Sequence, residues 1–131
     1  SIMTMGKRIA LALGGVALLG IGYAAGAADA PTPKGYIVAE IDVKDAATYK
    51  TYTDQATPIV AKFGGRYLVR GGNPTALEGT AAGPRVAILE YPSRAAAEAQ
   101  YRSSDYQKII PLRQRASTAR FFLLDGVPPT L

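Results

Sequence analysis

The side chains best suited to chemistry in this sequence are four charged residues that alternate along its predicted strands. Alternation places all four on the sheet face turned away from the helices, and they are Glu40, Arg70, Glu90 and Arg120. If they ring a pocket, Arg70 holds an anionic group and a glutamate with a raised pKa acts on a proton. The candidates for that glutamate are Glu40, Glu78 and Glu90. Two alternatives stay open: the four charges pair with one another near the ends of the sheet, since an unpaired buried charge is costly, or the strand faces are assigned wrongly.

A phenolic hydroxyl from Tyr52 adds a hydrogen-bond donor to these ligand-binding candidates. Tyr52 lies three residues after Tyr49 on a predicted amphipathic helix. That spacing is also typical of two tyrosines that pack in a core, so the structural and the functional interpretation both remain.

Composition narrows the chemistry. The 131 residues include no cysteine and no histidine, which excludes disulfides, thiol nucleophiles, imidazole bases and the usual soft metal sites. We therefore expect no metal and no cofactor. The net charge of +5 falls to +3 when Lys7 and Arg8, which precede the predicted domain, are set aside. Because this charge is small and scattered, we expect no binding to nucleic acid.

The stretch GGRYLVRGGNPTALEG, from Gly64 to Gly79, is rich in glycine but does not fit a phosphate-binding motif. It lacks the lysine and hydroxyl residue that end a P-loop, and it lacks the GxGxxG spacing of dinucleotide-binding turns. We interpret Gly64 and Gly65 as the end of a helix, and the run Gly71–Pro74 as a tight exit from a strand.

The periodicity of apolar residues changes in a regular order that predicts the elements carrying these side chains. Strands are predicted at Gly35–Val43, Arg66–Arg70, Arg85–Tyr91 and Thr118–Asp125, and helices after Asp45, after Ser93 and after Ser104 or Asp105. The order βαββαβ is that of a ferredoxin-like α+β fold, an antiparallel sheet with helices on one face. We expect this domain at residues 35–127, a linker at 31–34 and a tail at 128–131. Pro58 and Pro111 are expected to disturb their helices.

One face of this predicted sheet has no helix to cover it. Its apolar residues are Val38, Val86, Ile88, Phe122 and Leu124. A second subunit is the simplest cover, so we expect a homodimer whose two sheets pack face to face. A ligand or another partner protein is the alternative.

A resemblance to a known family rests on the segment Tyr67–Gly72, on Leu77–Gly79 and on the later Tyr106 and Arg113. These residues resemble the domain of unknown function thirteen-thirty family over about residues 35–127. The resemblance implies a ferredoxin-like fold of the dimeric α+β barrel superfamily, which includes cofactor-free monooxygenases, isomerases and haem enzymes. It implies no established activity, and the absence of histidine excludes haem held by that residue.

The amino-terminal segment, residues 1–30, indicates export. Ile9–Ala28 carries no charge and follows Lys7 and Arg8 directly, and a helix of about 20 apolar residues spans roughly 30 Å. A cleaved signal peptide and an uncleaved membrane anchor both fit, and both place the domain outside the cytoplasm. Gly22 and Gly26 form a GxxxG pattern, which is typical of contacts between membrane helices but also of glycine-rich signal peptides.

From these observations we expect a membrane-anchored accessory or binding module that faces the periplasm, possessing no strong catalytic signature and attached by its helix to a larger inner-membrane complex. The alternative is an exported, soluble and dimeric enzyme without a cofactor, which acts on a small anionic molecule near Arg70. In this alternative the signal is cleaved and the protein is soluble in the periplasm.

Overall fold

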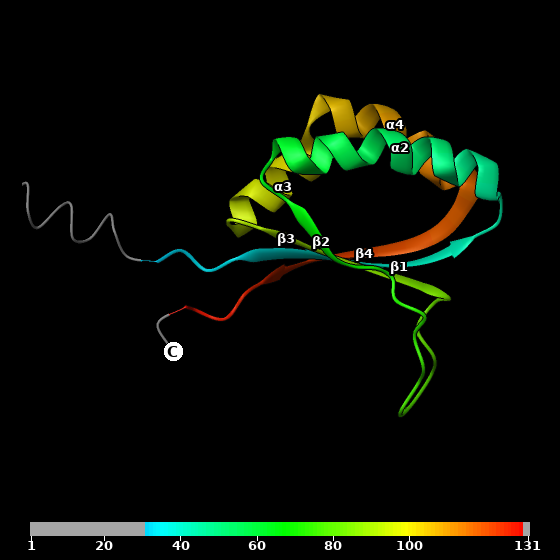
Figure 1. The fold of residues 1–131 in the computed structure, drawn as a ribbon, viewed down its shortest axis with the longest axis horizontal. Helices are drawn as coiled ribbons and strands as arrows, with labels where there is room; N and C mark the ends of the chain where they lie inside the picture. The colour runs from blue at the N-terminus through cyan, green and yellow to red at the C-terminus, as the bar shows by residue number, and fades with distance from the viewer. Residues whose placement is uncertain (1–30, 130–131) are drawn as a thin grey trace, which may run out of the picture. The chain divides into compact units, whose positions relative to one another are not determined.

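The computed structural model describes residues 31–129, which form an α+β fold of ferredoxin-like type (Figure 1). The elements in chain order are β1 (Gly35–Val43), α2 (Ala46–Lys62), β2 (Arg66–Gly71), β3 (Arg85–Tyr91), α3 (Arg94–Arg102), α4 (Ser104–Ala116) and β4 (Ser117–Asp125). The four strands pair in the order β2-β3-β1-β4, and every pair is antiparallel. The three helices cover one face of this sheet, as the sequence predicts.

The helices begin where short polar side chains cap them. Asp45 accepts a hydrogen bond from the backbone N–H of Thr48 at 3.2 Å, and Ser93 and Ser103 cap α3 and α4 in the same way. Pro58 and Pro111 lie inside α2 and α4 without ending them. The caps therefore fix where the helices begin, and neither proline divides a helix in two.

The core lies between the helices and the face of the sheet that they cover, which we call the helix face. Along β1 the residues Ile37, Ala39 and Ile41 are buried and alternate with partly exposed ones, because successive side chains of a strand point to opposite faces. Tyr52 and Tyr106 belong to a second buried cluster between α2 and α4. The alternation predicted for β1 is thus confirmed.

An irregularity in β2 breaks this alternation. Tyr67 pairs with Leu89 and Val69 pairs with Ile88, which leaves Leu68 between them without a partner on β3. One extra residue in a strand turns every later side chain to the opposite face. Arg70 consequently lies on the helix face, so its placement beside Glu40, Glu90 and Arg120 was wrong.

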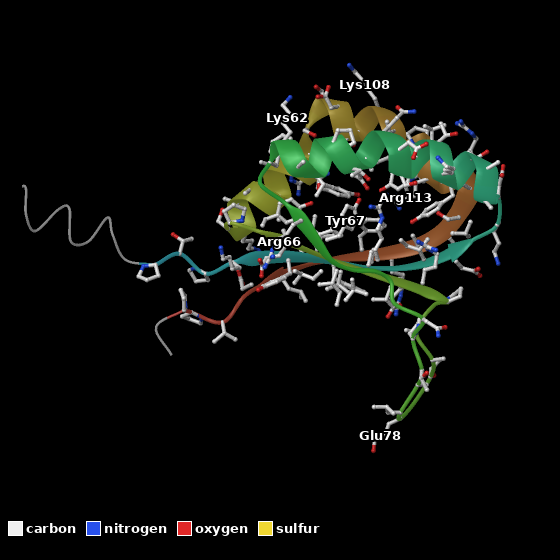
Figure 2. All side chains as sticks on the ribbon, viewed as in Figure 1. Lys62, Arg66, Tyr67, Glu78, Lys108 and Arg113 are labelled. Atoms are coloured by element: carbon white, nitrogen blue, oxygen red, sulfur yellow. The ribbon has the colours of Figure 1, made fainter. Side chains whose placement is uncertain are left out.

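The opposite face of the sheet, which we call the outer face, has no helix over it in Figure 1. Phe122 and Leu124 of β4 are 42% and 47% exposed there. The connection between β2 and β3, residues 72–84, extends away from the sheet on this side, with Glu78 at its tip (Figure 2). Positive φ angles at Gly71, Gly72 and Asn73 make the tight exit from β2 that the sequence predicts.

The predicted export segment and its candidate helix contacts, Gly22 and Gly26, lie outside the described residues. Among residues 31–129, no helix is long and apolar enough to cross a membrane.

Candidate functional site

A pocket lies between the helices and the helix face of the sheet, within a single chain. Its cavity volume is about 50 Å³. Apolar residues of β1 and β3 form its floor. Residues of α2 form most of its roof, and α3 and α4 contribute the rest. The polar side chains that line it are mostly tyrosines and arginines: Tyr49, Tyr52, Thr53, Tyr67, Arg70, Arg85, Gln100, Tyr101 and Tyr106.

Arg85 begins β3 and pairs with Ile41, a buried residue of the helix face. Its guanidinium carbon lies 5.6 Å from the ring centre of Tyr49, close enough for a cation–π contact. The Nε atom is buried and has no hydrogen-bond partner among the described residues. A buried donor without a partner is costly, so the Nε of Arg85 lowers the stability of the fold.

Arg113 of α4 is a second arginine in this region, and it is only 7% exposed. Its guanidinium lies 4.1 Å from the ring centre of Phe121 and 6.0 Å from that of Tyr52, and both rings line the pocket. As in Arg85, the Nε atom is buried with no partner in the described part of the chain. Arg113 therefore contributes positive charge immediately behind the pocket wall.

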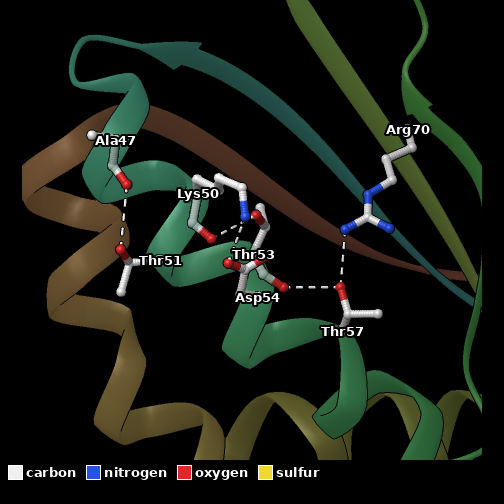
Figure 3. A network of polar contacts seen from close by, with 7 residues as sticks. All are labelled: Ala47, Lys50, Thr51, Thr53, Asp54, Thr57 and Arg70. Carbon is white, nitrogen blue, oxygen red and sulfur yellow. Dashed lines mark hydrogen bonds and ion pairs between the residues drawn. The ribbon is translucent and has the colours of Figure 1, made fainter.

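Arg70 lies where the pocket approaches the surface. Its Nη2 donates a hydrogen bond to the hydroxyl of Thr57 at 2.9 Å, which connects β2 to α2 (Figure 3). The guanidinium also stacks over the ring of Tyr67, with 4.3 Å between the guanidinium carbon and the ring centre. Both contacts are with neutral partners, so the charge of Arg70 remains available to an anion.

The hydroxyl groups of Tyr52 and Tyr106 share a hydrogen bond of 2.7 Å inside the protein. Burial raises the pKa of both tyrosines, and it raises the pKa of Tyr49 as well, although the neighbouring Arg85 partly opposes the shift there. These phenols are therefore neutral near pH 7 and act as hydrogen-bonding groups. They are poor candidates for a base.

The pocket carries an excess of positive charge. Its described lining includes no aspartate or glutamate. The seven ion pairs found among residues 31–129 involve none of the three arginines named above. In the same residues, no group of three acidic side chains is placed to hold a metal ion. An anion is the ligand that this arrangement favours.

The other predicted site residues lie elsewhere, on or beyond the outer face. Arg120 of β4 forms an ion pair with Glu40 of β1, as the pairing interpretation predicts. Glu90 instead accepts hydrogen bonds from the Tyr36 hydroxyl at 2.9 Å and from Arg66 at 3.0 Å. These contacts hold the pKa of Glu90 below its usual value, first through Tyr36 and then through Arg66. The raised pKa expected for a proton-transferring glutamate is therefore wrong for Glu90.

Glu78 is also separated from Arg70, because it lies at the far end of the 72–84 connection (Figure 2). Of the six ligand-binding candidates, only Arg70 and Tyr52 line the pocket. Sequence reasoning missed Arg85 and Arg113, although each left a signal. Arg85 shares its strand face with Ala87 and Leu89, and Arg113 follows Ile109 by four residues on the buried side of α4. An arginine within an apolar stripe is the pattern to look for.

Comparisons with known proteins agree with the fold described above. A protein of unknown function from Rhodopseudomonas palustris has a similar structure, with a TM-score of 0.61 and 22% identity over 82% of this chain and 92% of that one. SnoaB, a cofactor-independent oxygenase from Streptomyces nogalater, has a TM-score of 0.50 and 10% identity over 73% of this chain and 95% of that one. At these identities the likeness shows the fold alone.

No curated protein sequence matches this chain. A family model does match, over residues 34–127, and its description is "Domain of unknown function (DUF1330)". This span includes every strand and helix of the sheet domain and all the pocket residues named above. The chain therefore belongs to the DUF1330 family, as the resemblance of its strand and turn residues implied.

Proposed function

We propose that this domain binds a small anionic molecule in the pocket between its helices and its sheet. The observation that carries the proposal is the group of three arginines, Arg70, Arg85 and Arg113, that form no ion pair with a carboxylate of the described residues. Arg113 is buried and Arg85 partly buried, whereas Arg70 is exposed. A buried guanidinium group is costly unless a counter-charge accompanies it. A bound anion supplies that charge to the guanidinium groups that line the pocket.

The test is stabilisation by ligand. The purified protein is titrated with small carboxylates and with inorganic phosphate, and its thermal midpoint is followed for each. The Arg85→Met variant should lose the ligand-induced rise of the midpoint while remaining folded. Arg115→Met is the matched control, because Arg115 is an exposed residue of α4 outside the pocket lining. If no anion raises the wild-type midpoint at millimolar concentration, the proposal is wrong.

The partner of the outer face is a second part of this proposal. Phe122 and Leu124 are apolar and about half exposed there, and the ion pairs Glu40–Arg120 and Glu90–Arg66 lie on the same face. A second copy that packs its own outer face here covers the apolar residues, and the paired charges need no new partners. The pocket opens within one chain, so binding and dimerisation use different faces of the sheet.

The cellular location of the domain is a further part of the proposal, and it rests on the uncharged sequence from Ile9 to Ala28. An uncleaved anchor makes the domain a periplasm-facing binding module attached to a membrane complex. A cleaved signal makes it a soluble exported protein. The intact mass of the native protein and its need for detergent distinguish the two: a mature start near Ala28 with solubility in buffer contradicts the anchor.

A further inference from the structure

Arg85 and Arg113 lie near one end of the pocket, apart from Arg70. The backbone N–H of Asp45 bonds to the carbonyl of Ala116 at 3.0 Å, so the start of α2 lies beside the end of α4. Tyr49 is about one turn after Asp45, and Arg113 is about one turn before Ala116. Arg85 stacks on the same Tyr49. The guanidinium groups of Arg85 and Arg113 therefore lie near this end, which we call the cationic end, with that of Arg113 behind the pocket wall.

The hydroxyl pair of Tyr52 and Tyr106 comes next along the pocket. Tyr52 follows Tyr49 by one turn, and the two ring centres are 5.6 Å apart. Beyond the pair, the lining includes the apolar residues Val60 and Leu89, and Arg70 also lies on this side, bonded to Thr57 of α2. From the cationic end, the order along the pocket is thus charge, then neutral hydroxyl groups, then apolar walls, with Arg70 near the surface.

The size of the cavity limits what fits. A water molecule needs roughly 10–15 Å³ of such volume, so about 50 Å³ accommodates around four waters. An apolar cavity that holds benzene measures roughly 150 Å³ by comparison. The cavity therefore matches a molecule of about four to six non-hydrogen atoms and is too small for an aromatic acid in this conformation.

We propose that the ligand is a short 2-oxo or 2-hydroxy carboxylate, an acid of three carbons; this inference rests on the proposed function. The carboxylate lies at the cationic end and accepts hydrogen bonds from Arg85. The oxygen on the neighbouring carbon reaches the hydroxyl pair, where a Tyr52 or Tyr106 O–H donates to it. The short carbon chain contacts the apolar walls.

This assignment accounts for the mixture of groups in the pocket. A phosphate ion has oxygens on all sides and leaves its hydration shell for apolar walls at high cost. A simple fatty acid of the same length satisfies the arginine but leaves the hydroxyl pair without a new acceptor. A 2-oxo or 2-hydroxy acid meets both requirements, since one good hydrogen bond changes affinity by about tenfold.

The experiment compares five probes, pyruvate, lactate, propionate, phosphate and benzoate, by calorimetric titration of the full chain. Pyruvate or lactate should bind about ten times more tightly than propionate, and phosphate and benzoate should bind more weakly than either acid. In the double variant Tyr52→Phe, Tyr106→Phe, the preference for pyruvate or lactate over propionate should fall toward one. Circular dichroism checks that this variant is folded, and Tyr106→Phe alone replaces it if it is not.

The outcomes separate the two proposals. If none of the five anions binds, the proposed function and this inference both fail. If the anions bind but phosphate or benzoate is as tight as pyruvate, the function stands and the ligand class is overturned. The class is also overturned if wild type does not distinguish pyruvate or lactate from propionate, or if the preference survives loss of the hydroxyl groups.

Discussion

Replacing Arg85 by methionine should make the ligand-free protein more stable. The buried Nε–H of Arg85 has no partner, and an unsatisfied buried donor costs about 1–3 kcal/mol. The substitution also loses the contact of the guanidinium with Tyr49, whose 5.6 Å separation gives a cation–π interaction of about 0.5–1 kcal/mol. The difference favours Arg85→Met by about 1 kcal/mol. For a domain of this size, that raises the thermal midpoint by about 4–8 °C.

Saturating ligand should reverse this order. A ligand at one hundred times its Kd stabilises the folded state by about 2.7 kcal/mol, and the variant that does not bind it gains nothing. Wild type with ligand should then exceed Arg85→Met by more than 1 kcal/mol. Urea denaturation followed by circular dichroism, with and without the tightest probe, measures both differences.

The control for these measurements is Arg115→Met, which should change stability by less than about 0.5 kcal/mol in either condition because Arg115 is exposed. A ligand-free Arg85→Met protein that is less stable than wild type by 1 kcal/mol or more refutes the reasoning. In that case Arg85 stabilises the ligand-free fold, and its position in the pocket is explained by packing and not by ligand binding.

Three other perturbations address the rest of the molecule. Gly35→Ala should destabilise the fold by about 2 kcal/mol in urea denaturation, because a Cβ there lies 2.4 Å from the backbone Cα of Arg94; a change below 0.5 kcal/mol contradicts that packing. Phe122→Glu should convert a dimer to a monomer in sedimentation experiments, with ligand binding retained; a wild-type protein that is already monomeric removes the basis for the outer-face partner. Burial raises the pKa values of Tyr52 and Tyr106 in the folded state, so above pH 10 the folded state binds more protons than the unfolded chain and its free energy of unfolding falls as pH rises. Tyr52→Phe should reduce this alkaline loss of stability, and a variant with the same pH profile as wild type contradicts the assignment.

The strands and helices were predictable because their apolar residues repeat with clear periods. Gly35–Val43 and Arg85–Tyr91 begin and end where alternation predicts, and a helix does begin directly after Asp45, which caps it through a hydrogen bond from Thr48. The pairing of Glu40 with Arg120 was also predictable from the sequence, since both residues follow the regular alternation of strands that lie side by side.

The pocket was not predictable in the same way. The bulge at Leu68 adds one residue to β2, and neither Leu68 nor its neighbours Tyr67 and Val69 are a glycine or proline that marks such a site. The assumption of strict alternation along β2 therefore assigned Arg70 to the wrong face of the sheet. The position of the Arg113 guanidinium depends on how α4 packs against Tyr52 and Phe121, which are 61 and 8 residues away in the chain. Such contacts exist only after the helices have packed.

The single unpaired residue at Leu68 shows how β2 can be shortened without moving its arginine. Loss of Leu68 leaves Tyr67 opposite Leu89, Val69 opposite Ile88 and Arg70 opposite Ala87, now in a ladder without a bulge. A strand shortened at this point therefore keeps the guanidinium of Arg70 on the helix face.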